Sequence, residues 1–122
     1  MKAIKILLLS LIMCGLVFSS VFAAGDVEKG KALFNDPKAF GGTAGKSCAS
    51  CHPDGKGLEN SGAKGEKQWK NPAGSWTSLK DAINVCILMA NKGNALDPKS
   101  DDMKNIVAYI KSLGKKAGEK AM

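Results

Sequence analysis

The chain has 122 residues and a formal net charge of +7, all its basic residues are lysines, and aromatic residues make up only 6%. Once a leader is removed, a chain of this length has room for one small domain. The lack of arginine, the spread of the lysines and the scarcity of aromatic residues exclude the usual means of gripping phosphates and reading bases, so we expect no nucleic-acid partner.

The first residues have the pattern of an export signal. Lys2 and Lys5 supply a short positive region, residues 6–21 are almost continuously apolar, and Val21-Phe22-Ala23 provides small or β-branched residues before a cleavage site. We therefore predict a signal peptide over 1–23 and a mature domain over 24–122 that is periplasmic and has no membrane span. An uncleaved anchor is the competing interpretation, because the apolar run reaches the lower edge of the length that crosses a bilayer.

The mature chain begins with a short helical segment. Asp26 can cap a helix that begins at Val27, and Asn35-Asp36-Pro37 stops it after Phe34. A glycine-rich region without periodicity follows, and we expect loop there, with weak strand signals and one helical turn near the first cysteines of the mature chain. A loop of this length is unusual in a compact domain unless a functional group organises it.

Two amphipathic helices are predicted in the second half of the chain. One runs over about 78–91, with Ser78 as its cap and Lys92-Gly93 as its end. The other begins after a Ser100 cap and ends at Gly114, and the residues beyond it read as a solvated tail. The apolar positions of this last helix recur at three and four residues and are Met103, Ile106, Val107, Ile110 and Leu113.

The strongest chemical signal is the motif Cys48-Ala49-Ser50-Cys51-His52. Two thiols separated by two residues can reach the two vinyl groups of one porphyrin from a single helical turn, and His52 can then bind the iron. In an exported chain this spacing is typical of covalent attachment of one haem c. A redox-active dithiol would need a strand–helix–strand context, and a zinc site would need two further paired ligands, which the sequence does not offer.

With this motif the mature chain resembles the class I cytochromes c. Gly30 and Phe34 in the first helix and Val107-Ala108-Tyr109-Ile110 in the last resemble that family's crossing of terminal helices. The resemblance implies an all-α, small cytochrome c-like fold, with three main helices and long loops around a covalent haem. It also implies that the second nitrogen of His52 bonds a backbone carbonyl, which we expect from the loop over 53–62.

The second axial ligand of the iron is not settled by the motif. Most of the family uses a methionine in the loop before the final helix, and the corresponding loop here, over 93–98, has none. The candidates are Cys86, Met89 and Met103. Cys86 is favoured because a thiol left over in an oxidising compartment must be buried, ligated or paired, although an inert core cysteine is the simpler alternative.

A second, local resemblance also favours Cys86. The segments over 79–86 and 91–96, with Asp102-Met103-Lys104, are similar to haem c domains of sulfur-compound-oxidising cytochromes, where the cysteine after Ile-Asn binds iron. Two functions are considered, and only the second of them rests on this local resemblance. The favoured one is a periplasmic one-electron carrier whose lysines dock redox partners with acidic surfaces. The alternative is a haem subunit of a thiosulfate-oxidising enzyme, although no catalytic base or substrate pocket can be identified from the sequence.

Overall fold

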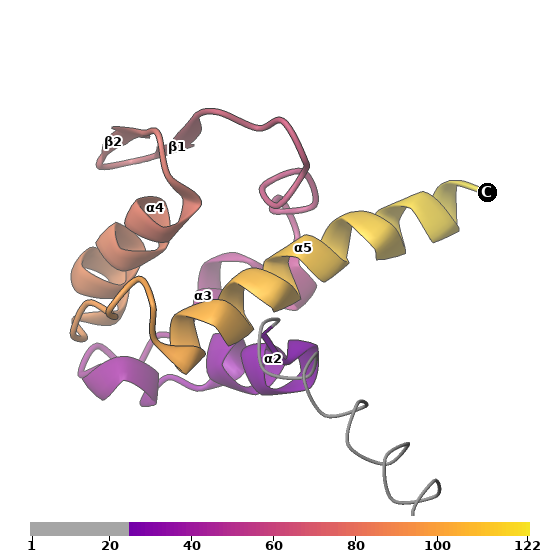
Figure 1. Cartoon of the computed structure of the whole chain (residues 1–122). Coiled ribbons are helices and arrows are strands. Elements are labelled where there is room, and N and C mark those ends of the chain that lie inside the picture. Colours follow the sequence, from indigo (N-terminus) through magenta and orange to yellow (C-terminus); the bar gives the residue numbers. More distant parts are fainter. Residues whose placement is uncertain (1–24) are drawn as a thin grey trace, which may run out of the picture.

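The computed structural model describes residues 25–122, so the predicted signal peptide over 1–23 lies outside the described residues. The structure is helix-rich, as the sequence predicts, and none of its described helices is long and apolar enough to cross a membrane. Figure 1 shows the elements packed around the long helix α5. In chain order they are α2 (Val27–Asn35), α3 (Cys48–Cys51), β1 (Trp69–Asn71), β2 (Gly74–Trp76), α4 (Leu79–Cys86), a π-helical turn (Ile87–Asn91) and α5 (Asp101–Ala121), with single 3₁₀ turns at Ala39–Gly41 and Pro53–Gly55.

Helices α2 and α5 begin where the sequence predicts, because each has a side-chain cap. The carboxylate of Asp26 accepts a hydrogen bond from the backbone N–H of Lys29 at 3.0 Å. The hydroxyl of Ser100 accepts one from the N–H of Met103 at 3.2 Å. Each bond satisfies a backbone donor that has no partner inside the first helical turn.

The crossing of α2 and α5 forms the centre of the fold (Figure 1). Gly30 is buried there, and a Cβ atom added to it would collide with the backbone carbonyl of Asn105 and lie 2.9 Å from the Cβ of Tyr109. One turn later the rings of Phe34 and Tyr109 pack edge to face, with centroids 5.0 Å apart. The cluster around this contact consists of Phe34, Ile83, Ile87, Met103, Ile106, Tyr109, Ile110 and Leu113.

The prediction that Gly114 ends the last helix is wrong, because α5 continues to Ala121. A glycine costs about 1 kcal/mol inside a helix but does not stop it unless its backbone turns left-handed. At Gly114 the missing side chain has a packing role, since an added Cβ would lie 2.9 Å from the carbonyl oxygen of Glu59. The lysine- and alanine-rich residues beyond it are good helix formers, and they extend α5 away from the rest of the structure (Figure 1).

The helix predicted over 78–91 has the expected bounds, with Ser78 at its start and Lys92 at its end, but it differs from the prediction in its cap and in its last turn. The side chain of Ser78 makes no capping bond, although its carbonyl accepts the N–H of Ala82. After Cys86 the backbone changes to a wider π-helical turn, and Lys92 ends it in the left-handed conformation. The turn buries Ile87 completely in the core. Single π turns of this kind are often found beside functional sites.

The hairpin of β1 and β2 was not predicted. Trp69 pairs with Trp76 and Asn71 with Gly74 across its two antiparallel strands. Each strand has only three residues, too few for an alternating pattern to be visible in the sequence. The turn between them did leave a signal, since Asn-Pro-Ala-Gly is typical turn chemistry and Gly74 has a positive φ of 148°.

The close crossing at Gly30 can be tested by substitution. We expect Gly30→Ala to lower the free energy of unfolding by about 1–3 kcal/mol, because the added methyl overpacks the contact with α5. Alanine is otherwise the better helix former, so the matched control Gly118→Ala, at an open position of α5, should raise it by up to about 1 kcal/mol. Urea unfolding followed by circular dichroism measures both, and equal effects of the two substitutions would contradict the packing argument.

Candidate functional site

The two thiols of the attachment motif lie on one helical turn. Helix α3 is capped by Ser47, whose backbone N–H donates to the hydroxyl of Ser50 at 3.0 Å. The N–H of His52 donates to the carbonyl of Cys48 at 3.0 Å, which closes the turn. Cys48 is half-buried and Cys51 is exposed. The local arrangement is the one that the motif needs, with both sulfurs and the imidazole grouped on one turn.

The structure identifies a backbone carbonyl that orients His52. The Nδ1 atom of its ring lies 3.0 Å from the carbonyl oxygen of Lys56, inside the loop over 53–62. Since a carbonyl can only accept, Nδ1 carries the proton, and Nε2 keeps its lone pair for a metal. Gly57, with φ of 90°, faces the same nitrogen, since a Cβ added to it would lie 3.7 Å away. A backbone carbonyl has no signature of its own in a sequence, so this partner could be found only in the structure.

The loop beside His52 is attached to the core. Asp54 and Gly55 both have positive φ values, 53° and 76°, and the resulting turn lays Gly55 against the side chain of Leu113 in α5. A Cβ added to Gly55 would collide with that leucine. The position of the imidazole is thus fixed by packing on the buried face of α5 as well as by α3.

Cys86 lies close to the thiols of α3 even though it comes from a different element. The pKa of the Cys48 thiol is raised to about 11, mostly by burial and next by the nearby charge of Cys86. Burial likewise raises the pKa of Cys86, the hydrogen bond from Asn71 opposes this, and the charge of Cys51 adds to it. Cys48 also packs against the core cluster that contains Ile87, the residue after Cys86, so the fold places α3 and the end of α4 on the same core.

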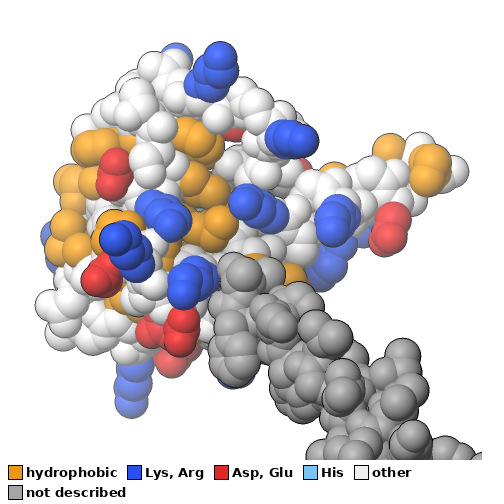
Figure 2. Space-filling model, in the orientation of Figure 1, with side chains coloured by type: hydrophobic (Ala, Val, Ile, Leu, Met, Phe, Trp, Pro, Cys, Tyr) orange, Lys and Arg blue, Asp and Glu red, His pale blue; other side chains and the backbone are white. Residues whose placement is uncertain are grey.

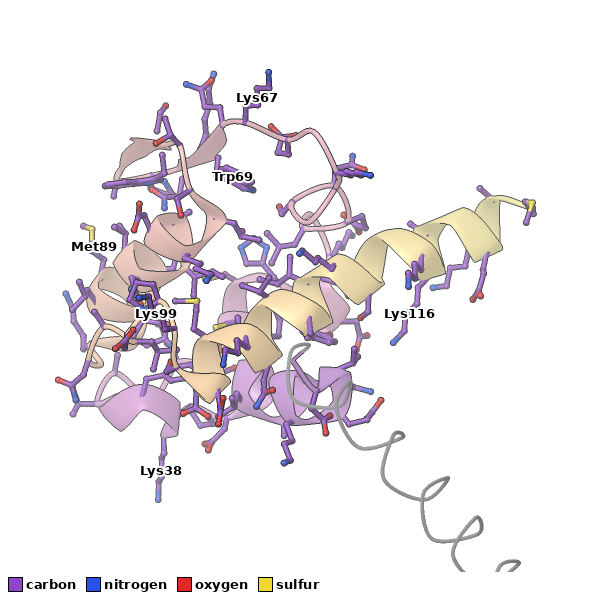
Figure 3. The ribbon with its side chains drawn as sticks, viewed as in Figure 1. Lys38, Lys67, Trp69, Met89, Lys99 and Lys116 are labelled. Carbon is purple, nitrogen blue, oxygen red and sulfur yellow. The ribbon has the colours of Figure 1, made fainter. Side chains whose placement is uncertain are left out.

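The two methionine alternatives have different surroundings from Cys86. Met103 is fully buried in the core cluster, between α5 and its neighbours. Met89 is 58% exposed and points outward from the middle of the π-helical turn (Figure 3). It does line the same cavity of about 180 Å³ as Cys86. Half-buried Cys86 has a polar partner, since the side-chain amide of Asn71 donates to its sulfur at 3.7 Å.

Two asparagines hold α4 and its π-helical turn in place relative to the motif. The buried side chain of Asn91 donates to the carbonyl of Lys46 at 2.9 Å, and the backbone carbonyl of Asn91 accepts the N–H groups of Thr43 and Ala44. Asn84 forms two bonds with the backbone of Leu96, at 2.9 and 2.8 Å. Sequence reasoning overlooked both, because an asparagine in an amphipathic helix shows only that a polar group is present.

A larger cavity, of about 710 Å³, lies between β1, the start of α4 and α5. Figure 2 shows hydrophobic side chains in a hollow on this face, with lysines around it. Trp69 projects toward the interior here, and its indole N–H donates to the carbonyl of Ser61 at 2.7 Å. The lining residues are Ser61, Gly62, Ala63, Lys64, Glu66, Trp69, Thr77, Ser78, Leu79, Lys80, Val107 and Lys111.

This cavity is large enough to take part of a cofactor-sized group, and lysines on its lining could pair with an anion. Its volume is in the range of cofactor sites, and its lining combines apolar side chains with lysines. Trp76, the partner of Trp69 across the hairpin, does not line the cavity, but its buried indole N–H has no acceptor within residues 25–122. The lining includes neither His52 nor any thiol, but β1 connects this cavity to the surroundings of Cys86. Trp69 lines the cavity, and Asn71, on the same face of the strand, contacts Cys86.

Comparison with known proteins identifies the relatives of this chain. Residues 29–117 match the model of the family described as SoxA/TsdA, cytochrome c domain. The chain is 36% identical over 90 residues to the L-cysteine S-thiosulfotransferase subunit SoxA of Chlorobaculum thiosulfatiphilum, and equally so to that of Chlorobaculum tepidum. The match covers 74% of this chain but only 28% of either relative. No solved structure matches. The chain therefore belongs to the SoxA/TsdA cytochrome c domain family, whose cytochrome domain holds a covalently bound haem c with its iron.

Proposed function

We propose that residues 24–122 form a periplasmic one-electron carrier in which Cys48, Cys51 and His52 hold the haem and Cys86 is the second axial ligand. The observation that carries this proposal is the setting of Cys86. Its half-buried thiol directly precedes Ile87 of the core cluster, against which Cys48 also packs, and its charge influences the thiol of Cys48. Haem c, when bound, supplies one-electron oxidation and reduction of its iron.

Each residue of the motif has a defined task in this proposal. Cys48 and Cys51 would hold the haem through two thioether bonds, each formed by adding S–H across a vinyl group so that the sulfur and the hydrogen go to the two vinyl carbons. His52 binds the iron through Nε2, because the carbonyl of Lys56 holds the proton on Nδ1. The cofactor also contributes apolar surface to a small domain that contains few aromatic residues.

As the iron ligand, Cys86 would set the reduction potential of the carrier. A thiolate donates charge to ferric iron and stabilises it, which lowers the reduction potential, whereas a thioether raises it. Met103 is engaged in core packing, and Met89 is largely exposed. Both surroundings favour Cys86 over the methionines, so we assign a low-potential carrier with His52/Cys86 ligation.

Charge and location complete the proposal. The mature residues carry 16 of the 18 lysines, after Lys2 and Lys5 are removed, and all 11 acidic residues, a net charge of about +5. Lys64, Lys80 and Lys111 line the larger cavity, so a redox partner with an acidic surface would be attracted to this face. Export by the segment over 1–23 would place the chain in the compartment where haem is attached to this motif.

The second candidate is a haem subunit of an enzyme that oxidises sulfur compounds such as thiosulfate. Its support is the family and the printed name of the relatives, L-cysteine S-thiosulfotransferase subunit. The chain spans little more than a quarter of the length of those relatives, and residues 25–122 hold one histidine and one attachment motif. The carrier needs no further catalytic group, so it remains the preferred function.

Covalent attachment is tested by removing the thiols. We expect the double variant Cys48→Ser/Cys51→Ser to lose all covalently bound haem, because a hydroxyl does not form the thioether. A haem stain on a denaturing gel measures the attachment. Cys86→Ser serves as the matched control and should keep its haem on the same gel. Loss of the stain in Cys86→Ser would contradict the assigned roles.

The ligand assignment is tested by spectroscopy and redox titration. We expect wild-type ferric protein to lack the far-red methionine-to-iron band, and Cys86→Ala to change the spectrum and raise the potential by tenths of a volt, since axial ligands span about 0.8 V. Met89→Leu should change neither. Met103→Leu should keep the spectrum while lowering stability by no more than about 1.5 kcal/mol. A wild-type methionine band, lost in either methionine variant, would overturn the assignment.

The two functions are separated by an assay with thiosulfate. We expect the purified holoprotein not to sustain oxidation of thiosulfate with an artificial electron acceptor. The same protein, reduced chemically beforehand, should still deliver its electron to that acceptor, which controls for damaged haem. Continued turnover of thiosulfate over many cycles would instead favour the enzyme subunit.

A further inference from the structure

The hydrogen bond from Asn71 to Cys86 is the feature that the proposed function does not yet use. The side-chain nitrogen Nδ2 of Asn71 lies 3.7 Å from the sulfur of Cys86, and both residues are half-buried. The other end of the same amide is also engaged, because its Oδ1 accepts the backbone N–H of Ala73 at 3.0 Å. A backbone N–H can only donate, so the oxygen must face Ala73 and the NH₂ group must face the sulfur.

The hairpin holds this amide in place. Asn71 is the last residue of β1, and it pairs with Gly74 across the turn. Gly74 has a φ of 148°, which side-chain-bearing residues rarely adopt, so this turn requires a glycine. Both strands pack on α4, which carries Cys86. The backbone of the hairpin and that of α4 therefore hold the amide of Asn71 against the sulfur of Cys86, whereas an amide on the surface rotates freely.

The surroundings of the sulfur offer it no comparable partner. The small cavity beside Cys86 is lined by Asn71 and, otherwise, by apolar residues, which are Pro72, Ala73, Val85, Met89 and Ala90. Within residues 25–122, no side chain other than Asn71 donates a hydrogen bond to this sulfur. In apolar surroundings a single donor has a larger electrostatic effect than in water.

We propose that Asn71 is a positioning residue that raises the reduction potential of the haem by donating a hydrogen bond to the sulfur of Cys86. This inference rests on the proposed ligation of iron by Cys86. A donor to a thiolate withdraws negative charge from the sulfur, and the thiolate then donates less to the iron. Ferric iron loses more stabilisation than ferrous iron, so the bond favours the reduced state.

Three variants separate the donor from the turn. Asn71→Leu has a similar shape and removes both hydrogen bonds. Asn71→Asp keeps the oxygen that accepts from Ala73, so the hairpin is preserved, but it has no donor. Asn71→Ser retains a donor and a turn-forming oxygen. Spectra and circular dichroism check that each variant keeps its haem and its fold.

We expect Asn71→Leu and Asn71→Asp to lower the potential, so that at a fixed ambient potential the ratio of reduced to oxidised protein falls about three- to tenfold. Tenfold corresponds to about 59 mV for a one-electron couple. Asn71→Ser should lie between these variants and wild type. The matched control is Asn35→Leu, an exposed asparagine on α2 whose amide bonds its own helix, and it should leave the potential unchanged.

The same substitution in a Cys86→Ala background shows whether Asn71 acts through the sulfur. With no sulfur to accept the bond, Asn71→Leu should no longer change the potential. An equal shift in both backgrounds, or no shift in Asn71→Leu and Asn71→Asp, would overturn the inference. Failure of the proposed ligation has a different signature, because Cys86→Ala alone would then keep the wild-type spectrum.

Discussion

The contact between α2 and α5 at Gly30 is the constraint on which the rest of the structure depends. It joins the first and last helices of the described domain, and the edge-to-face pair of Phe34 and Tyr109 seals it. Closing so long a loop costs chain entropy, which the buried face of α5 offsets by packing. Everything between the two helices must then run around the interior, which is why long loops and a sizeable cavity coexist in so short a chain.

The site inherits its geometry from that core. Gly55 packs on Leu113, so α5 fixes the position of the loop that orients His52. Ile87 lies in the same core cluster, so packing on α5 also fixes the position of Cys86, the preceding residue. The side chain of Asn91 then ties the end of the π-helical turn to the segment before α3. On the proposed ligation, both iron ligands, His52 and Cys86, are thus positioned by a single packed surface.

The two groups differ in the kind of partner that holds them. His52 is oriented by the backbone carbonyl of Lys56, which fixes the ring and keeps Nε2 available. Cys86 is approached by the side-chain amide of Asn71, which acts on the charge of the sulfur. On the proposed ligation, the carbonyl of Lys56 mainly fixes the orientation of the His52 ring, and the amide of Asn71 mainly changes the charge on the sulfur of Cys86. This division would let the potential vary by substitutions in a short hairpin without disturbing the attachment of the cofactor.

Local features could be predicted from the sequence. The caps Asp26 and Ser100, the helical turn at the cysteines and the apolar face of α5 depend on neighbouring residues, whose spacing is visible in the chain itself. The attachment motif is local for the same reason, so the cofactor could be predicted as well.

The features that were missed or mistaken are the β1–β2 hairpin, the extension of α5 to Ala121 and the π-helical turn. The hairpin and the π-helical turn reflect packing between distant segments, which can override weak local preferences, whereas the extension of α5 follows from the helix-forming residues beyond Gly114. The partners of His52 and Cys86 were likewise decided only by the tertiary structure, because a carbonyl in a loop and an amide in a turn acquire a role only when folding brings them to a particular atom.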